Sequence, residues 1–529
     1  MVLRPFFMRV WLYTFLLLAG LVGCGAPALR PEAPPEVRAC LEFLRASDEA
    51  VQEAGVRDAQ ATRVPGFPYL RVNRFLASFS KDNLQGPRFQ AWIEQMQTLE
   101  VEGRDKEYRA LSATQRAGLS PGSPSAGHLL TRARSCGDQL GRFDLAEARA
   151  RMRLVNAAQV PPDYSRWQRV LGLYPLTSLV IFQGVLRYHH EVAMTYATPL
   201  DNLPVKGRLI RFTPPPSTGL LASSEVARIL RRSADNPLRI PKPQGEDQRR
   251  LFATFAPVWE VDVAGETDRI GMPYWGRAAE VNTGEPVVLT HLSHGRLGAE
   301  VLLQLNYIIW FPARPRTGPF DLLGGRLDGI IWRVTLGADG RPLIYDSVHN
   351  CGCYHRFFPT PRLRLVRRHV GFEEPILVPQ RIPLEQSRKV LRVASTSHYV
   401  QRVQSAVGNA ATGKAEVVYR FRDYDELRAL PVADGHRSLF GPDGIVPDTE
   451  RRERCLLWPT GVDSPGSMRQ WGRHAVAFVG ERHFDAPELI ERYFEVLPEG
   501  AGGTLNGGLE TPAQPGMTPK RPRALRAPS

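Results

Sequence analysis

Side chains that could bind a metal are concentrated between residues 291 and 355. His349, Cys351, Cys353 and His355 fall within one short stretch, directly after the strand-like run 341–347. Thiolate and imidazole groups are donors that zinc, copper(I) and iron accept in proteins. The cluster therefore makes a metal site one hypothesis, although one residue separates the two cysteines and common zinc motifs have two.

A second pair of donors, His291 and His294, precedes this cluster and is followed by Glu300. The apolar run 287–290 predicts a strand, so we expect His291 at its end and His294 on the following loop or helix start. Two histidines three residues apart share one side of a helical or turned backbone, but point to opposite faces of an extended strand. A polar loop or a helix cap around Ser293 is the alternative interpretation.

If both clusters meet, the metal could leave one position open and activate water to hydrolyse an envelope substrate. Asp346 or Glu300 would then orient a histidine or act as the base. Three structural interpretations compete: a disulfide between Cys351 and Cys353, a disulfide from one of them to Cys455, or simple packing. A thiolate–imidazole pair within the same loop is a further alternative.

Other histidines carry weaker patterns. His189, His190 and Glu191 stand at the expected end of a helix that begins at Tyr174-Pro175. Adjacent helical residues point about 100° apart, so we favour a helix-terminus role for them. His398, His436, His474 and His483 show no pattern of a specific chemistry.

The chain that must position these groups divides by periodicity. From about residue 37 to 204 the apolar spacing is helical, clearest in 36–53, 89–99 and 145–154. Pro175 opens another helix, and its eleven-residue apolar run 176–186 predicts a buried core helix rather than a membrane span.

From residue 205 to 498 the patterns favour strands. The run 259–263 alternates, 305–311 resembles a fully buried strand, and 330–336 places Ile330 and Trp332 on one face and Arg333 on the other. Asp339-Gly340 indicates a hairpin between 330–336 and 341–347. Further runs predict strands at 390–394, 416–421 and 475–479, and a final amphipathic helix at 486–494. The fold class is therefore α+β, with a helical region followed by a larger mixed, mainly antiparallel β-rich domain.

Length and composition fit a globular protein. The 529 residues are 43% hydrophobic and 23% charged, with a formal charge of +14. Seven lysines leave 61 arginines among the 68 basic residues. No basic block exceeds two residues, so no nucleic-acid partner is expected.

The N-terminus has the pattern of a secretory signal. Arg4 and Arg9 precede the apolar run 10–22, which is too short to span a bilayer and ends in small residues. Leu21-Val22-Gly23-Cys24 resembles the lipobox of bacterial lipoproteins. The resemblance implies cleavage of signal peptide 1–23, acylation of Cys24 and anchoring in a lipid bilayer, with Gly25 pointing to the outer membrane. Cleavage removes two arginines and no acid, which leaves a charge of +12.

After this signal, residues 24–36 are expected to form the lipidated cysteine and a Pro-rich tether, and 499–529 a disordered tail. The periplasm permits disulfides, and Cys40 with Cys136 is the first pairing expected, because both lie in helical segments of one region. The predicted function is a lipid-anchored cell-envelope protein that binds an envelope protein or polymer without catalysis. The alternative is a zinc-, copper- or iron-binding periplasmic protein that uses the 291–355 cluster, with a metal-dependent hydrolase as one form of it.

Overall fold

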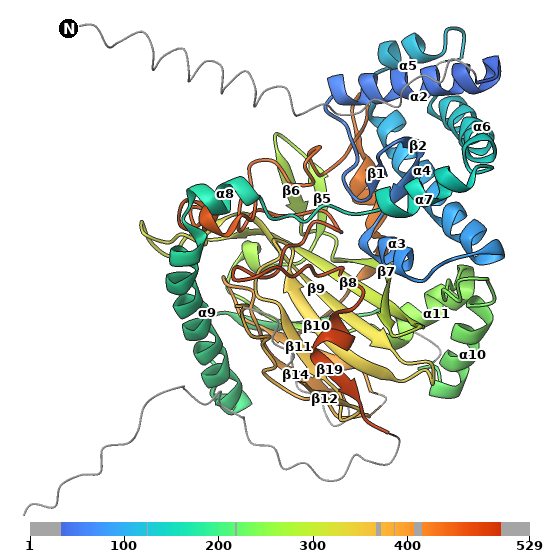
Figure 1. The fold of residues 1–529 in the computed structure, drawn as a ribbon. Coiled ribbons are helices and arrows are strands. Elements are labelled where there is room, and N and C mark those ends of the chain that lie inside the picture. The colour runs from blue at the N-terminus through green and yellow to red at the C-terminus, as the bar shows by residue number, and fades with distance from the viewer. Residues whose placement is uncertain are drawn as a thin grey trace, which may run out of the picture.

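A computed structural model describes residues 33–498 except 124, 217–218, 367–371, 386 and 407–414. The predictions for the signal peptide, Cys24 and the C-terminal tail therefore lie outside the described residues. Within the described chain the fold is α+β, as predicted: helices come first, and mixed, mostly antiparallel sheets follow (Figure 1).

The N-terminal region is a group of helices around a short hairpin. Its core joins Trp92 and Met96 of the longest helix to Tyr69 and Leu70 of the hairpin. Capping side chains define several helix starts, such as Ser125, whose hydroxyl accepts from the His128 N–H. The elements are α2 (Pro35–Glu53), β1 (Thr62–Val64), β2 (Phe67–Val72), α3 (Arg74–Ser78), η1 (Phe79–Lys81), α4 (Gly86–Ala110), α5 (Ala113–Leu119), α6 (Ala126–Asp144) and α7 (Ala148–Ala157).

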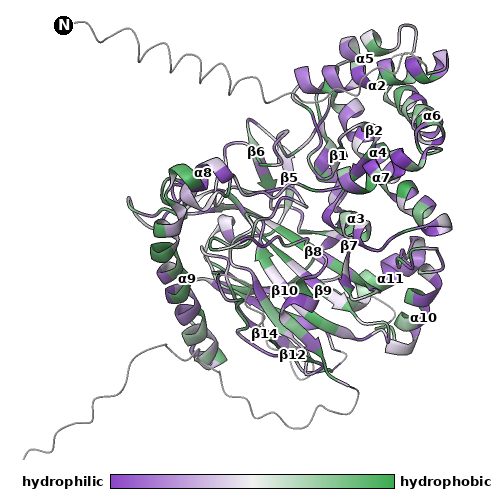
Figure 2. Cartoon of the chain, in the orientation of Figure 1, coloured by the Kyte–Doolittle hydropathy of each residue, from purple (hydrophilic) through white to green (hydrophobic). Residues whose placement is uncertain are grey.

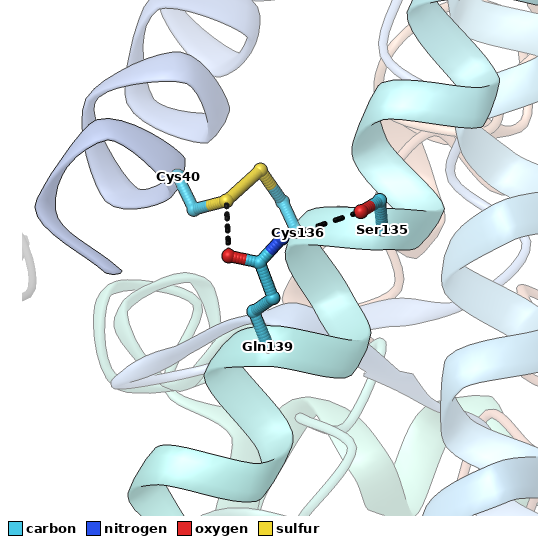
Figure 3. Close-up of a disulfide and its surroundings, with 4 residues drawn as sticks. All are labelled: Cys40, Ser135, Cys136 and Gln139. Atoms are coloured by element: carbon cyan, nitrogen blue, oxygen red, sulfur yellow. Dashed lines mark hydrogen bonds between the residues drawn. A yellow bond between two sulfur atoms is a disulfide. The ribbon is translucent and has the colours of Figure 1, made fainter. Parts of the chain in front are cut away.

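A disulfide joins α2 to α6 in this region. Cys40 and Cys136 are bonded across 96 residues of sequence, with their Cα atoms 5.1 Å apart. Figure 3 shows the bond between the two helices, with Gln139 of α6 lying against the Cys40 sulfur. The predicted pairing is confirmed. Among the described residues the remaining cysteines are free, so neither Cys351 nor Cys353 is bonded to the other or to Cys455.

Two sheets form the β-rich part. The six-stranded sheet has the order β11-β10-β9-β8-β7-β16, and the five-stranded sheet has the order β14-β13-β4-β3-β15. Their strands are β3 (Arg208–Thr213), β4 (Val258–Val263), β7 (Val287–Leu297), β8 (Glu300–Arg314), β9 (Gly325–Leu336), β10 (Pro342–His349), β11 (Arg356–Pro359), β13 (Lys389–Val393), β14 (Val400–Ser405), β15 (Ala415–Val418) and β16 (Arg420–Asp423).

The main core lies between these sheets. Odd-numbered side chains of β8, including Tyr307 and Ile309, share one buried cluster with Trp259 of β4 and Leu391 of β13. Even-numbered β8 residues such as Trp310 enter a second cluster on the other face. Strand β8 is thus buried on both sides, which explains its continuous apolar sequence.

Smaller elements surround the sheets. Helices α10 and α11 pack on the main core through Val226, Leu230 and Leu251. These elements are α8 (Arg166–Leu171), α9 (Tyr174–Ala197), η2 (Leu200–Asn202), α10 (Ser223–Ser233), α11 (Gly245–Phe255), η3 (Glu266–Asp268), β5 (Met272–Trp275), β6 (Ala279–Asn282), β12 (Leu363–Leu365), η4 (Tyr424–Ala429), β17 (Leu430–Val432), β18 (Gly435–Arg437), α12 (Arg454–Leu457), η5 (Trp458–Thr460), α13 (Leu489–Tyr493) and β19 (Phe494–Val496).

Several local predictions are wrong. No strand forms at 475–479, where only an isolated bridge joins Ala475 to His483. The helix expected over 486–494 is shortened to α13, because Phe494 already belongs to β19, which pairs with β12.

The prediction of a buried core helix at 176–186 is also wrong. Helix α9 begins at Tyr174 with Pro175 in its first turn, as expected, but it runs along one edge of the molecule (Figure 1). Its buried residues are only Ser178, Val192 and Tyr196. The described chain contains no helix that is long and apolar enough to cross a membrane.

Candidate functional site

His291 and His294 are not placed as predicted. Strand β7 does not end near Thr290 but continues to Leu297, because it pairs along its length with β8. Both histidines are therefore in an extended strand, three residues apart, and face opposite ways. The His291 ring lies 4.7 Å from that of Trp471, whereas the His294 ring is stacked 5.0 Å from Phe75.

The His349–His355 loop connects β10 to β11, where the sequence predicted it. His349 is the last residue of β10, and its Nδ1 lies 3.3 Å from Oδ1 of Asp328. His355 directs its Nε2 toward Asp346, at 2.8 Å. Asp346 also receives two hydrogen bonds from the Arg333 guanidinium. The two imidazoles are thus held by different carboxylates.

The two cysteines of this loop are buried thiols. Cys351 and Cys353 flank Gly352, whose φ of 88° gives the loop its sharp turn. The backbone N–H of Cys353 donates to the Cys351 sulfur at 3.4 Å. The neighbouring Cys351 and burial together raise the pKa of the Cys353 thiol well above its ordinary value. A reactive thiolate is disfavoured at this position.

The structure does not bring the six predicted ligands together. In the described part of the chain, no group of three or more His, Cys, Asp or Glu residues is arranged to hold a metal ion. His291 and His294 occupy opposite faces of β7, and His349 and His355 are each oriented by a carboxylate. Convergence of the two clusters was the condition for a shared metal centre, and the described geometry does not meet it.

Instead, the structure shows a buried chain of alternating acids and histidines. Asp268 of η3, His398, Asp328 of β9 and His349 of β10 are in contact in that order. His398 Nε2 lies 3.2 Å from Asp268 Oδ1, and His398 Nδ1 lies 2.8 Å from Asp328 Oδ2. Asp328 Oδ1 then contacts His349 Nδ1. We call these four residues the acid–histidine chain.

The charges of this chain follow from its contacts. Burial alone would lower the pKa of His398. The hydrogen bonds and negative charges of the two carboxylates that face its ring nitrogens have a larger effect, so the pKa of His398 is raised. The same contacts lower the pKa of Asp268, and that of Asp328 falls well below its usual range. Burial lowers the pKa of His349. An imidazolium at His398 between two carboxylates, beside a neutral His349, is the favoured state.

The backbone around this chain is strained. Leu327, Tyr354, Thr396 and His398 all have positive φ values, between 49° and 66°. Such conformations cost about 1–3 kcal/mol each for residues other than glycine, and they persist only where surrounding contacts fix them. One such contact is the Thr396 N–H, which donates to Asp268 Oδ1 at 2.7 Å. The acid–histidine chain therefore holds the loops in place.

Aromatic and basic side chains enclose its His349 end. The His349 ring lies 5.0 Å from Tyr354 and 5.6 Å from Tyr399, and the Arg314 guanidinium lies over the Tyr399 ring. Glu453 lies close enough for the charges of Arg314 and Asp328 to affect it, and burial raises its pKa to about 7. An enclosed imidazole oriented through Nδ1 resembles a general base in its hydrogen bonding.

The acid–histidine chain is enclosed by the surrounding fold. Asp268, Asp328, His349 and His398 are all buried. Two surface hollows of the described chain, one beside Thr213 and Leu220 and one beside Asp163 and Arg473, are lined by none of these four residues. The polar groups face one another and bind together η3, β9, β10 and the loop after β13. The contacts of these four residues are therefore internal to the described fold.

The sequence interpretation missed three members of the chain. Asp268 and His398 are 130 residues apart, and neither is part of a recognisable spacing. Asp328 carried a weak signal, since it is an acid next to the apolar run of β9. Only His349 was proposed, and for a different role.

Comparisons with protein-family models, with curated proteins and with solved structures found no match to this chain.

Proposed function

We propose that this chain is a lipid-anchored protein of the bacterial cell envelope with a binding or structural role. The lipobox-like sequence ending at Cys24, preceded by Arg4, Arg9 and a short apolar run, supports the anchor. Acyl chains on Cys24 would attach the folded part to a bilayer, and more than one chain gives stable attachment.

The observation that carries the proposed location is the disulfide between Cys40 and Cys136. Disulfides persist in oxidising compartments such as the periplasm and are rare where glutathione or thioredoxin keeps thiols reduced. Two helices that are distant in sequence depend on this bond in the N-terminal region. A folded part matured outside the cytoplasm agrees with an export signal.

A non-catalytic role is supported by how the chemistry-bearing residues are used. The acid–histidine chain is enclosed, its one imidazolium lies between its two carboxylates, and it joins four parts of the fold. His355 and Asp346 form a separate buried group with Arg333. These buried groups stabilise the β-rich part of the chain, and in the proposed role that part would contact an envelope partner.

The test is to express the full chain and a Cys24→Ala variant in a Gram-negative host. We expect the wild type in the outer-membrane fraction, with its N-terminal peptide starting at an acylated Cys24 by mass spectrometry. The Cys24→Ala variant should retain residues 1–23 and carry no acyl mass. Cys455→Ala, which changes an exposed cysteine of the folded part, is the matched control and should behave as wild type.

An unmodified Cys24 in the mature wild type would overturn the anchor. Elemental analysis of the chain purified without chelator tests the proposed non-catalytic role against the metal-dependent alternative. One transition metal per chain, lost in a folded His291→Ala/His349→Ala variant, would replace the binding role by the metal-dependent alternative.

A further inference from the structure

An apolar surface is exposed where helix α8 turns into α9. Trp167, Val170 and Leu171 of α8 and Leu176, Leu179 and Val180 of α9 are each at least 54% exposed. We call these six residues the α8–α9 face. Figure 2 shows hydrophobic colour along the outer edge of both helices. Contiguous apolar surfaces of this kind mark interaction sites on proteins that otherwise bury such side chains.

The apolar surface continues onto neighbouring segments. Both α8 and α9 contact η5, which also contacts α12. Leu456 of α12 and Trp458 of η5 are exposed there, and Phe320 is 90% exposed in the loop before β9. That loop is held against the segment that leads into α12, because Arg452 Nη1 donates to the Pro319 carbonyl at 2.7 Å. Residues from three distant parts of the sequence thus form one surface.

The face is held rigidly by the fold beneath it. Arg169, on the inner side of α8, donates to the carbonyls of Thr460 and Gly480 and pairs with Glu481 at 2.6 Å. At the other end of α9, Val192 and Tyr196 enter the main core. The exposed side chains are therefore presented by a preformed helix pair anchored on both sides, and no described segment covers them.

We propose that the α8–α9 face rests on the surface of the phospholipid bilayer to which Cys24 is attached, with its apolar side chains inserted between the lipid headgroups. The proposal rests on the proposed lipid anchor for its bilayer, but the contact itself depends only on the folded part.

The tether favours a bilayer over other occupants. Eight residues separate Cys24 from Ala33, the first described residue, and a chain of that length reaches roughly 30 Å at most. The folded part of an anchored molecule therefore stays beside the bilayer at a high effective concentration. A weak surface contact suffices under that condition.

The composition of the rim also fits a bilayer. Exposed Arg166, Arg452 and Arg454 border the apolar side chains, where anionic phospholipid headgroups would meet them. Two acids are close: Glu450 lies 3.9 Å from Arg454, and Glu481 is paired with Arg169. Glu453 and Asp321 also belong to these segments, so the exposed arginine side chains, and not a net positive charge, would meet the headgroups. Trp167 and Trp458 add the amphipathic rings that favour the boundary between headgroups and acyl chains.

The test uses the unlipidated chain from residue 25 onward, which contains every described residue, so failure of lipidation does not affect it. The probe is a vesicle of phosphatidylethanolamine and phosphatidylglycerol, and binding is measured by co-sedimentation. Leu171→Gln/Leu176→Gln/Val180→Gln should weaken vesicle binding by about tenfold or more, because it removes three exposed apolar side chains. The matched control, Tyr274→Gln/Leu365→Gln/Val418→Gln, changes exposed apolar residues elsewhere and should bind as wild type.

A fluorescent label on the exposed Cys455 of α12 gives an independent readout. We expect its emission to shift to the blue when vesicles are added to the wild type, and not with the triple variant of the face. Equal thermal unfolding of all three proteins would show that the substitutions leave the fold intact. For a misfolded triple variant, Val180→Gln alone replaces it, with a smaller loss expected.

Three outcomes would overturn the proposal. The wild type could fail to bind vesicles, the triple variant of the face could bind them equally well, or two copies of the chain could dimerise through the face instead of binding a bilayer. Sedimentation velocity detects the last outcome, because the wild type would then dimerise and the variant would not. Each of these results is compatible with an acylated Cys24, so the anchor and the contact are tested separately.

Discussion

Asp58 and Arg428 form a buried ion pair although 370 residues separate them: Arg428 Nε and Nη2 donate to the two carboxylate oxygens of Asp58 at 3.1 and 2.8 Å. Asp58 precedes the N-terminal hairpin, and Arg428 belongs to η4 in the β-rich part. Asp58 also accepts from Gln470 at 2.8 Å. The helical region is therefore attached to the later part of the chain through buried charge.

Replacing Asp58 tests how much this connection contributes. Asp58→Asn should lower the free energy of unfolding by about 3 kcal/mol, the low end for breaking a buried pair, because it removes one of the two carboxylates that pair with the buried Arg428 guanidinium and leaves only Asp425. Guanidinium chloride unfolding followed by circular dichroism measures the change. Glu49→Gln, which breaks the exposed pair with Arg45, is the control and should cost less than about 0.5 kcal/mol. Similar small losses in both variants would contradict a buried charged connection.

A second prediction concerns the acid–histidine chain: replacing histidine by phenylalanine should destabilise the protein at His398 but not at His474. His398→Phe keeps the ring that stacks 3.9 Å from Phe311 but leaves the carboxylates of Asp268 and Asp328 without a cation. We expect a loss of about 3–5 kcal/mol in the free energy of unfolding.

His474→Phe is the matched comparison. Both ring nitrogens of His474 are buried, and neither makes a hydrogen bond of ordinary geometry in the described structure; the nearby Asn350 carbonyl accepts from the Arg469 N–H instead. Removing such atoms leaves no partner unsatisfied, so the variant should be within about 1 kcal/mol of wild type, or more stable. Thermal unfolding of the two variants side by side measures the difference. A destabilised His474→Phe beside an unaffected His398→Phe would refute the assignment of roles.

How far the sequence could predict this structure depends on where the determining contacts lie. The alternation of Ile330, Trp332 and Val334 correctly predicted β9, and Asp339-Gly340 correctly predicted its hairpin with β10. These signals are local, because the strand period and the turn conformation are written in adjacent residues. The Cys40–Cys136 pairing also followed from two helical segments and a compartment.

Predictions that required a distant partner failed. The length of β7 depends on its pairing with β8, so His291 and His294 could not be assigned to faces from their own spacing. The apolar run of α9 predicted a buried helix, but its own sequence could not show that no described segment would cover Leu176, Leu179 and Val180. The contact of His398 with Asp268 and Asp328 has no local pattern at all.

The dependence of stability on pH follows from buried histidines. Burial lowers the pKa of His355 and His474 to about 4, whereas both take up protons near pH 6.5 in the unfolded chain. Their contribution to stability is complete above pH 6.5 and is lost as the pH falls toward 4. Each should change the free energy of unfolding by up to about 1.4 kcal/mol per pH unit in that window.

His398 acts in the opposite direction, because its raised pKa gives a contribution that is present below pH 6.5 and lost as the pH rises through the folded value. Denaturant unfolding at several pH values between 4 and 8 measures the sum. In His474→Phe the decline toward pH 4 should be shallower. In His398→Phe the slope below pH 6.5 should be unchanged, and the loss of stability that His398 causes as the pH rises above 6.5 should be absent. Parallel profiles for the wild type and both variants would contradict this account.

The cysteines make the last prediction. Reducing the Cys40–Cys136 bond, or replacing both residues by alanine, should lower the free energy of unfolding by about 4–5 kcal/mol, since the bond closes a loop of about a hundred residues in the unfolded chain. Cys455→Ser should leave the free energy of unfolding unchanged, because Cys455 is exposed and free.

In the chain from residue 25 onward, a thiol reagent should modify Cys455 in the native protein and reach Cys351 and Cys353 only after unfolding. Rapid modification of all three thiols in the folded protein would show that the loop between β10 and β11 opens in solution, and the acid–histidine chain would then not hold it closed.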